Sequence, residues 1–263
     1  MKVALTIAGS DPSGGAGLQA DLKTFHQFGV FGTSVVTAVT VQNTAAVLGN
    51  HAVPPDIVVA QLAAVVGDLP PAATKTGMLG TGAVVEAVAG ALRRHRLPHF
   101  VLDPVIIATS GGRLLDQDAV RVMTEQLLPL AEMVTPNLSE AAALTGHSVD
   151  DPASMVRAGH ALRQMGAGAA LIKGGHLRAE RLVDVLVTAA GVQQFEHARI
   201  ETTSTHGTGC TLSAAIVAGL ALGRALELAV ADAVEFVQRA IHAAPGLGTG
   251  HGPLQHRVDP PRG

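Results

Sequence analysis

Hydrophobic and polar positions follow two alternating patterns along the chain. Short apolar, β-rich runs alternate with longer Ala- and Leu-rich segments of helical period, and Gly, Pro, Asp or Asn marks most changes between them. The short runs predict strands over residues 3–8, 34–41, 73–76, 100–102, 133–135, 169–172 and 182–187. The longer segments predict helices over residues 18–28, 56–66, 81–94, 139–144, 152–165, 208–222 and 226–243.

Several of the predicted strands are apolar on both faces. This pattern is typical of strands inside a parallel sheet that helices cover above and below. The sequence therefore predicts an α/β fold with a mainly parallel central sheet and helices on both faces. No linker rich in Pro, Ser or like charges divides the chain, and no repeat of about 20–50 residues is present. We expect one domain spanning residues 1–263.

Composition narrows the classes of function. The 263 residues are 48% hydrophobic and 15% charged, with a formal net charge of −3. Aromatic residues make up 2% of the chain, with no Trp or Tyr, which disfavours binding of single-stranded nucleic acid by base stacking. The sequence has no block of Lys and Arg residues of the kind that would bind duplex DNA or an anionic membrane. The expected partner is a small molecule.

Cysteine usage and the N-terminal sequence bear on the compartment. The single cysteine, Cys210, excludes an intramolecular disulfide and any zinc site that needs two thiolates. The apolar run over residues 3–8 is too short for a signal peptide. The chain has no uninterrupted run of about 18 apolar residues, which a membrane-spanning helix would require. We expect a cytoplasmic protein.

A glycine-rich segment, GSDPSGGAG at residues 9–17, separates the first predicted strand from the first predicted helix. Glycines there would let the backbone approach a ligand closely, and the same segment also reads as a simple tight turn. Residues 15–20 match the dinucleotide pattern G-x-G-x-x-A. A nicotinamide site needs an acidic residue about 20 positions later, and none occurs between Asp21 and Asp56. The sequence does not predict a dinucleotide site.

The motif HGTGCT at residues 206–211 precedes an apolar run, residues 212–219, that predicts an amphipathic helix. Gly207, Thr208, Gly209 and Cys210 at the helix start would present backbone N–H groups to an anion. The helix dipole there would favour the thiolate form of Cys210, which could then act as a base or as a nucleophile. Phosphoryl transfer requires such an anion hole and a proton acceptor. The alternative is a small buried cysteine beside a glycine turn.

Two further polar clusters follow predicted strands. Asn137 and Glu140, within TPNLSE, would lie on one side of a short turn. An amide and a carboxylate can hold hydrated magnesium, but the same spacing is typical of a helix capping box, which is the better interpretation of these residues alone. Lys173 follows the strand over residues 169–172, at the edge where open α/β sheets bind ligands.

These motifs occur in a family-specific order. The chain carries LTIAGSDPSGGAGLQADLKT (5–24), AVTVQNT (38–44), KTGML (75–79), LDPV (102–105), TPN with Glu140, KGGH (173–176) and THGTGCT (205–211). It resembles the hydroxymethylpyrimidine and hydroxymethylpyrimidine-phosphate kinases of thiamine biosynthesis, in the ribokinase-like superfamily. The resemblance implies a three-layer α/β/α fold, ATP and Mg²⁺ as cofactors, two successive phosphoryl transfers, and a homodimer.

The resemblance also implies roles for individual residues. The pyrimidine pocket would include Gly9, Asp21, Gln42, Met78 and Val105. Cys210 would be the catalytic base, in an anion hole formed by Gly207, Thr208, Gly209 and Cys210. The nucleotide phosphates would contact Lys173, Asn137 and Thr208, and magnesium would be held by Glu140 and, through its water shell, by Asp103.

Two other functions stay open. A pyridoxal or pyridoxine kinase of the same superfamily would bind a similar flat heterocycle with a hydroxymethyl group, and Gln42 is the main reason to prefer the pyrimidine. A non-catalytic pyrimidine-binding protein could keep the fold, although intact Cys210, Glu140 and Lys173 argue against it. Residues 202–205 read TTST, where the family often has Lys or Arg and Asn, so the nucleotide contacts there are open.

Overall fold

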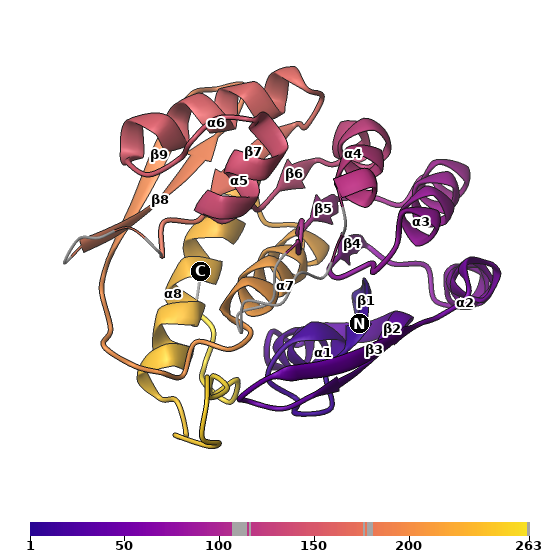
Figure 1. The fold of residues 1–263 in the computed structure, drawn as a ribbon, viewed down its shortest axis with the longest axis horizontal. Helices are drawn as coiled ribbons and strands as arrows, with labels where there is room; N and C mark the ends of the chain where they lie inside the picture. Colours follow the sequence, from indigo (N-terminus) through magenta and orange to yellow (C-terminus); the bar gives the residue numbers. More distant parts are fainter. Residues whose placement is uncertain (107–114, 116, 176, 178–180, 262–263) are drawn as a thin grey trace.

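The computed structural model describes residues 1–106, 115, 117–175, 177 and 181–261. In this part of the chain one nine-stranded sheet has the order β3-β2-β1-β4-β5-β6-β7-β8-β9 (Figure 1). The strands are β1 (Val3–Ser10), β2 (Phe31–Gln42), β3 (Val47–Ala52), β4 (Ala73–Thr76), β5 (Phe100–Leu102), β6 (Met133–Val134), β7 (Ala169–Ile172), β8 (Arg181–Val187) and β9 (Val192–Ala198). The helices are α1 (Gly17–Gln27), α2 (Pro55–Asp68), α3 (Gly82–His95), α4 (Gln117–Gln126), α5 (Leu138–Thr145), α6 (Pro152–Gln164), α7 (Thr208–Ala221) and α8 (Leu226–His242), with a 3₁₀ turn at Leu128–Leu130.

The sheet is mainly parallel, as the sequence predicts. Strands β2, β1, β4, β5, β6 and β7 are parallel neighbours. Antiparallel strands close both edges, β3 against β2 on one side and β8 and β9 on the other. The sequence patterns did not predict β3, β9 or α4. No residue of β3 or β9 is buried, so these edge strands lack the apolar runs of the central strands.

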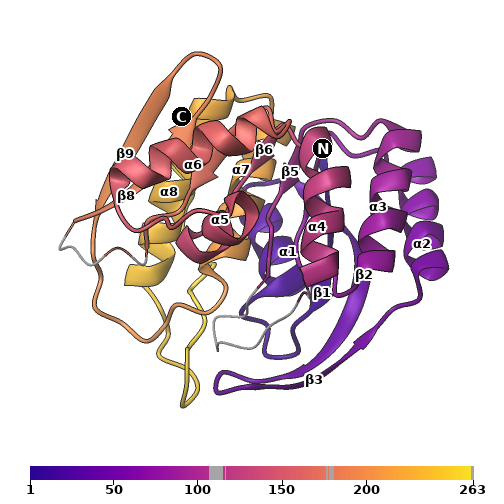
Figure 2. The same cartoon turned by 45° about the horizontal axis from the view of Figure 1, so that its top comes forward.

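Successive side chains of the central strands point to opposite faces and join two separate cores. Leu5 and Leu102 pack with α2, α3, α4, α5 and α6 on one face. Ala4, Val101 and Leu171 pack with α1, α7 and α8 on the other. Figures 1 and 2 show these two helical groups on opposite sides of the sheet. The three-layer α/β/α arrangement is therefore confirmed.

Helix α7 is not amphipathic, so that expectation is wrong. Every side chain over residues 211–221 is buried, because α7 lies between the sheet and the helices α1 and α8. A helix buried on all sides is apolar all round, so its sequence carries no polar stripe. Its position at the centre of one layer directs its first turn at the carboxyl ends of β1, β4 and β5.

The glycine-rich loop after β1 packs against the start of α7. Gly207 has φ 87°, a left-handed conformation that favours glycine. A Cβ atom on Gly207 would lie 1.8 Å from the carbonyl oxygen of Gly15, so the two loops approach backbone to backbone. No helix in the described ranges is long and apolar enough to cross a membrane.

Candidate active site

A cavity of about 570 Å³ lies at the carboxyl edge of the parallel strands. The order of the strands in the sheet places its lining residues in a row. Gln42 ends β2, Gly9 lies near the end of β1, and Met78 follows β4. On the other side of the first turn of α7, Asn137 follows β6 and Lys173 follows β7. The sequence-predicted residues that line the cavity are Gly9, Gln42, Met78, Asp103, Val105, Asn137, Glu140, Lys173, Gly207, Thr208, Gly209 and Cys210.

Asp21 is the one predicted site residue that the structure does not bring to the cavity. Its carboxylate is fully buried on α1 and accepts hydrogen bonds from Thr6 Oγ1 at 2.6 Å and Lys75 Nζ at 2.7 Å. Lys75 Nζ also lies 3.4 Å from the carbonyl oxygen of Cys210. Asp21 therefore lies behind the site, in contact with a lysine that itself contacts the first turn of α7.

The start of α7 has free backbone N–H groups. The amides of Gly207, Gly209 and Cys210 donate to no acceptor among the described residues, and the Thr208 amide has only a 3.4 Å contact with Thr205 O. All four residues line the cavity. Unpaired N–H groups at a helix N-terminus attract an anion, because the helix dipole is positive there.

The expected thiolate at Cys210 is wrong for this state of the site. Burial by surrounding protein raises the pKa of the thiol to about 12, although the positive charge of Lys75 and a hydrogen bond from the Gly17 amide oppose the rise. The negative charges of Asp21 and Asp103 raise the pKa further. Desolvation outweighs the helix dipole here, so Cys210 is a neutral thiol near pH 7.

A cluster of one partly buried lysine and two buried carboxylates lies beside the anion hole. Lys173 Nζ is 3.2 Å from Asp103 Oδ1 and 3.8 Å from Glu140 Oε2. Asp103 also accepts hydrogen bonds from Thr135 Oγ1 at 3.2 Å and Ser213 Oγ at 3.0 Å. Burial favours the protonated form of Asp103, but Lys173 and Lys75 outweigh it and lower its pKa.

Glu140 has the opposite shift. Burial raises its pKa to about 7, with a further contribution from the charge of Asp103, and Lys173 only partly opposes this. A carboxyl group that burial keeps partly protonated at neutral pH is expected to ionise more fully when a cation arrives.

Asn137 and Glu140 also form the capping box of α5. Asn137 Oδ1 accepts from the Glu140 amide at 2.9 Å, and Glu140 Oε2 accepts from the Asn137 amide at 2.8 Å. The capping interpretation is confirmed, and both residues still line the cavity. No group of three His, Cys, Asp or Glu side chains that could enclose a metal occurs in the described ranges. The oxygen ligands here suit a magnesium ion that keeps waters and phosphate oxygens as its other ligands.

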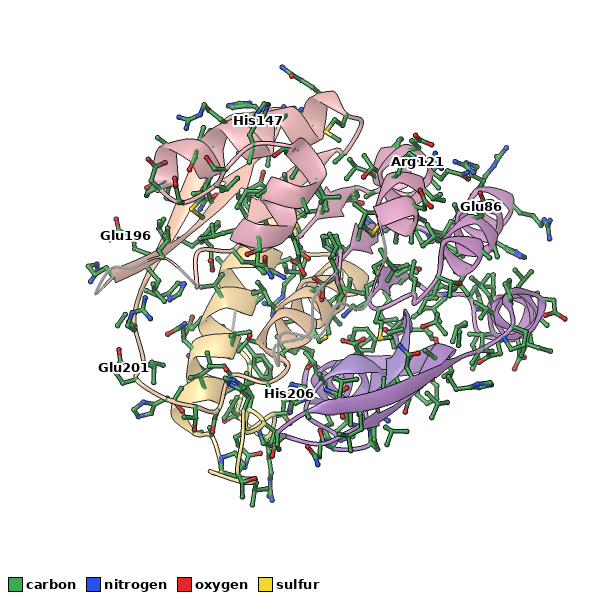
Figure 3. The ribbon with its side chains drawn as sticks, in the orientation of Figure 1. Glu86, Arg121, His147, Glu196, Glu201 and His206 are labelled. Carbon is green, nitrogen blue, oxygen red and sulfur yellow. The ribbon has the colours of Figure 1, made fainter. Side chains whose placement is uncertain are left out.

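The sequence motifs did not predict two groups of cavity residues. Asp11, in the glycine-rich loop, accepts a hydrogen bond from His206 at 2.8 Å. Figure 3 shows His206 between the N-terminal strands and the C-terminal segment. On the β8–β9 side, His197 lies 3.3 Å from Asp184 Oδ2 and 3.0 Å from Gln238 Nε2. The partners in each group are far apart in the sequence, so no motif of fixed spacing could have predicted them. His176 of the KGGH motif lies outside the described residues.

The fold and the site together define the class of protein as a ribokinase-like kinase. The structure superimposes with a TM-score of 0.91 on an ADP complex of Bacillus subtilis pyridoxal kinase, which is 38% identical and matches over 97% of each chain. A family model described as phosphomethylpyrimidine kinase matches residues 11–255. The chain belongs to the phosphomethylpyrimidine kinase family.

Curated relatives and a second structure agree with this family. A hydroxymethylpyrimidine/phosphomethylpyrimidine kinase of Rhizobium meliloti is 49% identical over 257 residues, which cover 97% of this chain and 96% of the relative. The thiamine biosynthesis bifunctional protein ThiED of Geobacter sulfurreducens is 48% identical over 96% of this chain, and the match spans 51% of that longer protein. A phosphomethylpyrimidine kinase (thiD) structure from Clostridium difficile 630 has a TM-score of 0.82 at 39% identity, over 92% of this chain and all of that one.

Proposed function

We propose that this chain transfers a phosphoryl group from ATP to the hydroxymethyl group of 4-amino-5-hydroxymethyl-2-methylpyrimidine, and then a second one to the resulting monophosphate. One observation carries the proposal. A single cavity combines the free amides at the start of α7 with a wall of one amide and two apolar side chains, Gln42, Met78 and Val105. The family and its named relatives support the same activity.

The wall near β1 and β2 suits a flat aminopyrimidine. The carboxamide of Gln42 has both donors and acceptors, so it can pair with a ring nitrogen and an exocyclic amine. Met78 and Val105 supply apolar contacts for the faces of the ring, and Gly9 leaves room for it. A Cβ atom on Gly9 would lie 3.2 Å from the sulfur of Met78, so a larger residue at position 9 would crowd this wall.

The wall near α7 suits the phosphoryl group during its transfer. Free amides of Gly207, Gly209 and Cys210 stabilise negative charge on its oxygens. In its thiolate form, which is the minor form near pH 7, Cys210 accepts the proton of the acceptor alcohol. Lys173 Nζ holds a positive charge next to the same turn. A Cβ atom added at Gly209 would lie 3.1 Å from Lys173 Nζ, which shows how close this charge is.

Magnesium fits the carboxylates beside Lys173. Glu140, Asn137 and Asp103 would hold the ion, Asp103 through its waters because three donors already occupy its oxygens. When bound, the ion neutralises charge on the nucleotide phosphates. A homodimer, which the resemblance implies, and a cytoplasmic location, which the sequence patterns favour, stay predictions.

Phosphorus NMR tests the proposal directly. The purified chain is incubated with ATP, magnesium and the hydroxymethylpyrimidine, and the products are followed in time. We expect a monophosphate that converts into a pyrophosphate. ADP release with neither product would contradict the proposal.

A pyridoxal or pyridoxine kinase is the second candidate, because the structure superimposes on a pyridoxal kinase with a TM-score of 0.91. Competition between hydroxymethylpyrimidine and pyridoxine at equal concentration separates the two candidates. We expect the pyrimidine products to dominate. Predominant pyridoxine phosphate would establish the second candidate instead.

A further inference from the structure

Asp11 collects hydrogen bonds from its own loop and from His206. The carboxylate accepts from the amides of Ser13 at 2.9 Å, Gly15 at 3.2 Å and Ala16 at 2.8 Å, from Ser13 Oγ at 2.7 Å, and from His206 Nε2 at 2.8 Å. Burial alone would raise the pKa of Asp11, but the bonds from His206, Ser13 and Ala16 outweigh it and lower the pKa to about 2. An ionised carboxylate has no proton to give, so His206 Nε2 must carry the hydrogen of this bond.

The carboxamide of Gln42 lies next to this pair. Its Nε2 is 3.3 Å from His206 Nε2, and its Oε1 is 3.3 Å from Thr40 Oγ1. Thr40 has a single hydroxyl proton, and the carbonyl oxygen of Ser10 is the closer acceptor at 2.9 Å. In this placement an N–H group of Gln42 faces the Nε2–H group of His206, and a lone pair of the Thr40 hydroxyl faces the carbonyl oxygen of Gln42.

A half-turn of the amide corrects both contacts. The oxygen of Gln42 would then share the single Nε2 hydrogen of His206 with Asp11, in a three-centre hydrogen bond whose shorter branch goes to Asp11. The nitrogen would donate to Thr40 Oγ1. The two positions have nearly the same shape, so hydrogen bonding decides between them. Two independent partners, one on each side of the amide, favour the same orientation.

We infer that His206, held by Asp11, is a positioning residue that determines substrate specificity by locking the Gln42 carboxamide with its oxygen toward His206 and its nitrogen toward Thr40. This inference rests on the proposed function and names the part of the substrate that the site recognises.

The lock leaves a defined hydrogen-bonding pattern for the substrate. A carboxamide has two N–H donors and two acceptor lone pairs. His206 takes one acceptor and Thr40 takes one donor, so one of each remains. A ring nitrogen next to an exocyclic amine, as in an aminopyrimidine, satisfies both remaining groups. A pyridine alcohol has no adjacent pair of this kind, so the locked amide selects against it.

A double-mutant cycle between His206 and Gln42 tests the inference. His206→Phe keeps a ring beside Gly15 but removes the donor, while Asp11 keeps its loop partners. Gln42→Met keeps the length of the side chain without the amide. In the wild-type background we expect His206→Phe to raise the KM for the aminopyrimidine about tenfold and to lower its preference over pyridoxine by the same factor. The kcat and the KM for ATP change less than about twofold.

The Gln42→Met background distinguishes positioning from a purely structural role. There, His206→Phe should change the KM for the aminopyrimidine less than about twofold, because no amide remains to be oriented. An equal loss in both backgrounds would overturn the inference. If the wild-type chain makes no phosphorylated pyrimidine, the proposed function fails instead.

Nitrogen-15 NMR of histidine-labelled wild-type chain gives a readout that needs neither variant. His206→Phe identifies the His206 resonance by its loss. We expect a hydrogen on Nε2 of His206. A neutral ring with the hydrogen only on Nδ1 would remove the basis of the lock.

Discussion

Cys210 illustrates how one residue can have a local sequence context and a tertiary environment that oppose each other. The start of a helix lowers the pKa of a thiol, yet burial raises that of Cys210 to about 12. At neutral pH only a small fraction of a thiol with so high a pKa is ionised, but the thiolate that forms is a strong base. The first transfer, onto an alcohol, needs such a base, whereas the second, onto a phosphate anion, does not.

Cys210→Ala should therefore slow the first transfer about 10²–10⁴-fold, the usual contribution of a general base, and the second far less. Single-turnover rates with each acceptor measure the difference. In the wild type the first rate should rise with pH between about 7 and 9, because the thiolate fraction grows below a pKa of about 12. Equal losses in the two steps would contradict this role.

Glu140→Gln tests a pH dependence of stability in the absence of nucleotide and magnesium. The folded pKa of Glu140 is raised from 4.5 to about 7, so between these values the folded chain holds a proton that the unfolded chain releases. Stability should fall as pH rises through this range, by up to about 3 kcal/mol. Glutamine keeps an oxygen for the Asn137 amide and does not titrate.

Urea unfolding at pH 5 and pH 8 measures this effect. We expect the variant to lose less stability than the wild type between the two values, and to be the more stable of the two at pH 8. The same pH difference in both proteins would show that Glu140 does not carry a raised pKa.

At the scale of elements, the junction between the loop after β1 and the start of α7 depends on backbone contact. Gly207 combines a left-handed φ with a carbonyl oxygen where a Cβ atom would lie. Gly223, in the turn after α7, has a similar φ of 85° but nothing within 4 Å of a Cβ position. Comparing substitutions at Gly207 and Gly223 therefore separates the cost of backbone strain from the cost of a steric clash between the two loops.

Gly207→Ala should unfold the chain or cost well over 3 kcal/mol, since strain and a clash with the Gly15 backbone add together. Gly223→Ala should cost only about 1–2 kcal/mol, from strain alone. Urea unfolding gives both values. A folded Gly207→Ala variant is also expected to lose phosphoryl transfer, because the free amides would move. Similar costs at the two glycines would contradict the proposed contact.

At the scale of the whole molecule, the Asp21–Lys75 ion pair joins α1, β4 and α7. Both side chains have no exposed surface, and Lys75 also reaches the Cys210 carbonyl. Burial disfavours the Lys75 ammonium, but the charge of Asp21 outweighs it and raises the pKa of Lys75. The pair thus connects helix α1 and strand β4 with the turn that carries the anion hole.

Lys75→Met should destabilise the fold by about 3–5 kcal/mol, because Asp21 would be left as an unpaired buried charge. The double variant Lys75→Met/Asp21→Leu should recover most of this loss. Chemical denaturation of the wild type, the single variant and the double variant measures both numbers. A double variant as unstable as the single one would contradict the ion-pair explanation.

Much of the fold was predictable because burial leaves a pattern in the sequence. The strands over residues 73–76, 100–102 and 169–172 have the predicted bounds, since apolar runs mark strands covered on both faces. The edge strands β3 and β9 were missed because solvent exposure permits polar residues there. Most predicted site residues line one cavity, because the ends of parallel strands share an edge of the sheet.

The sequence by itself determined the alternation of strands and helices, the glycine turns and the family, because each of these depends on neighbouring residues. Only the tertiary structure decided that Asp21 pairs with Lys75 behind the cavity and that the Cys210 thiol keeps its proton. It also placed His206 beside Asp11 and Gln42. Desolvation and hydrogen bonding between distant segments depend on what the folded chain packs around a group, and no local pattern records that.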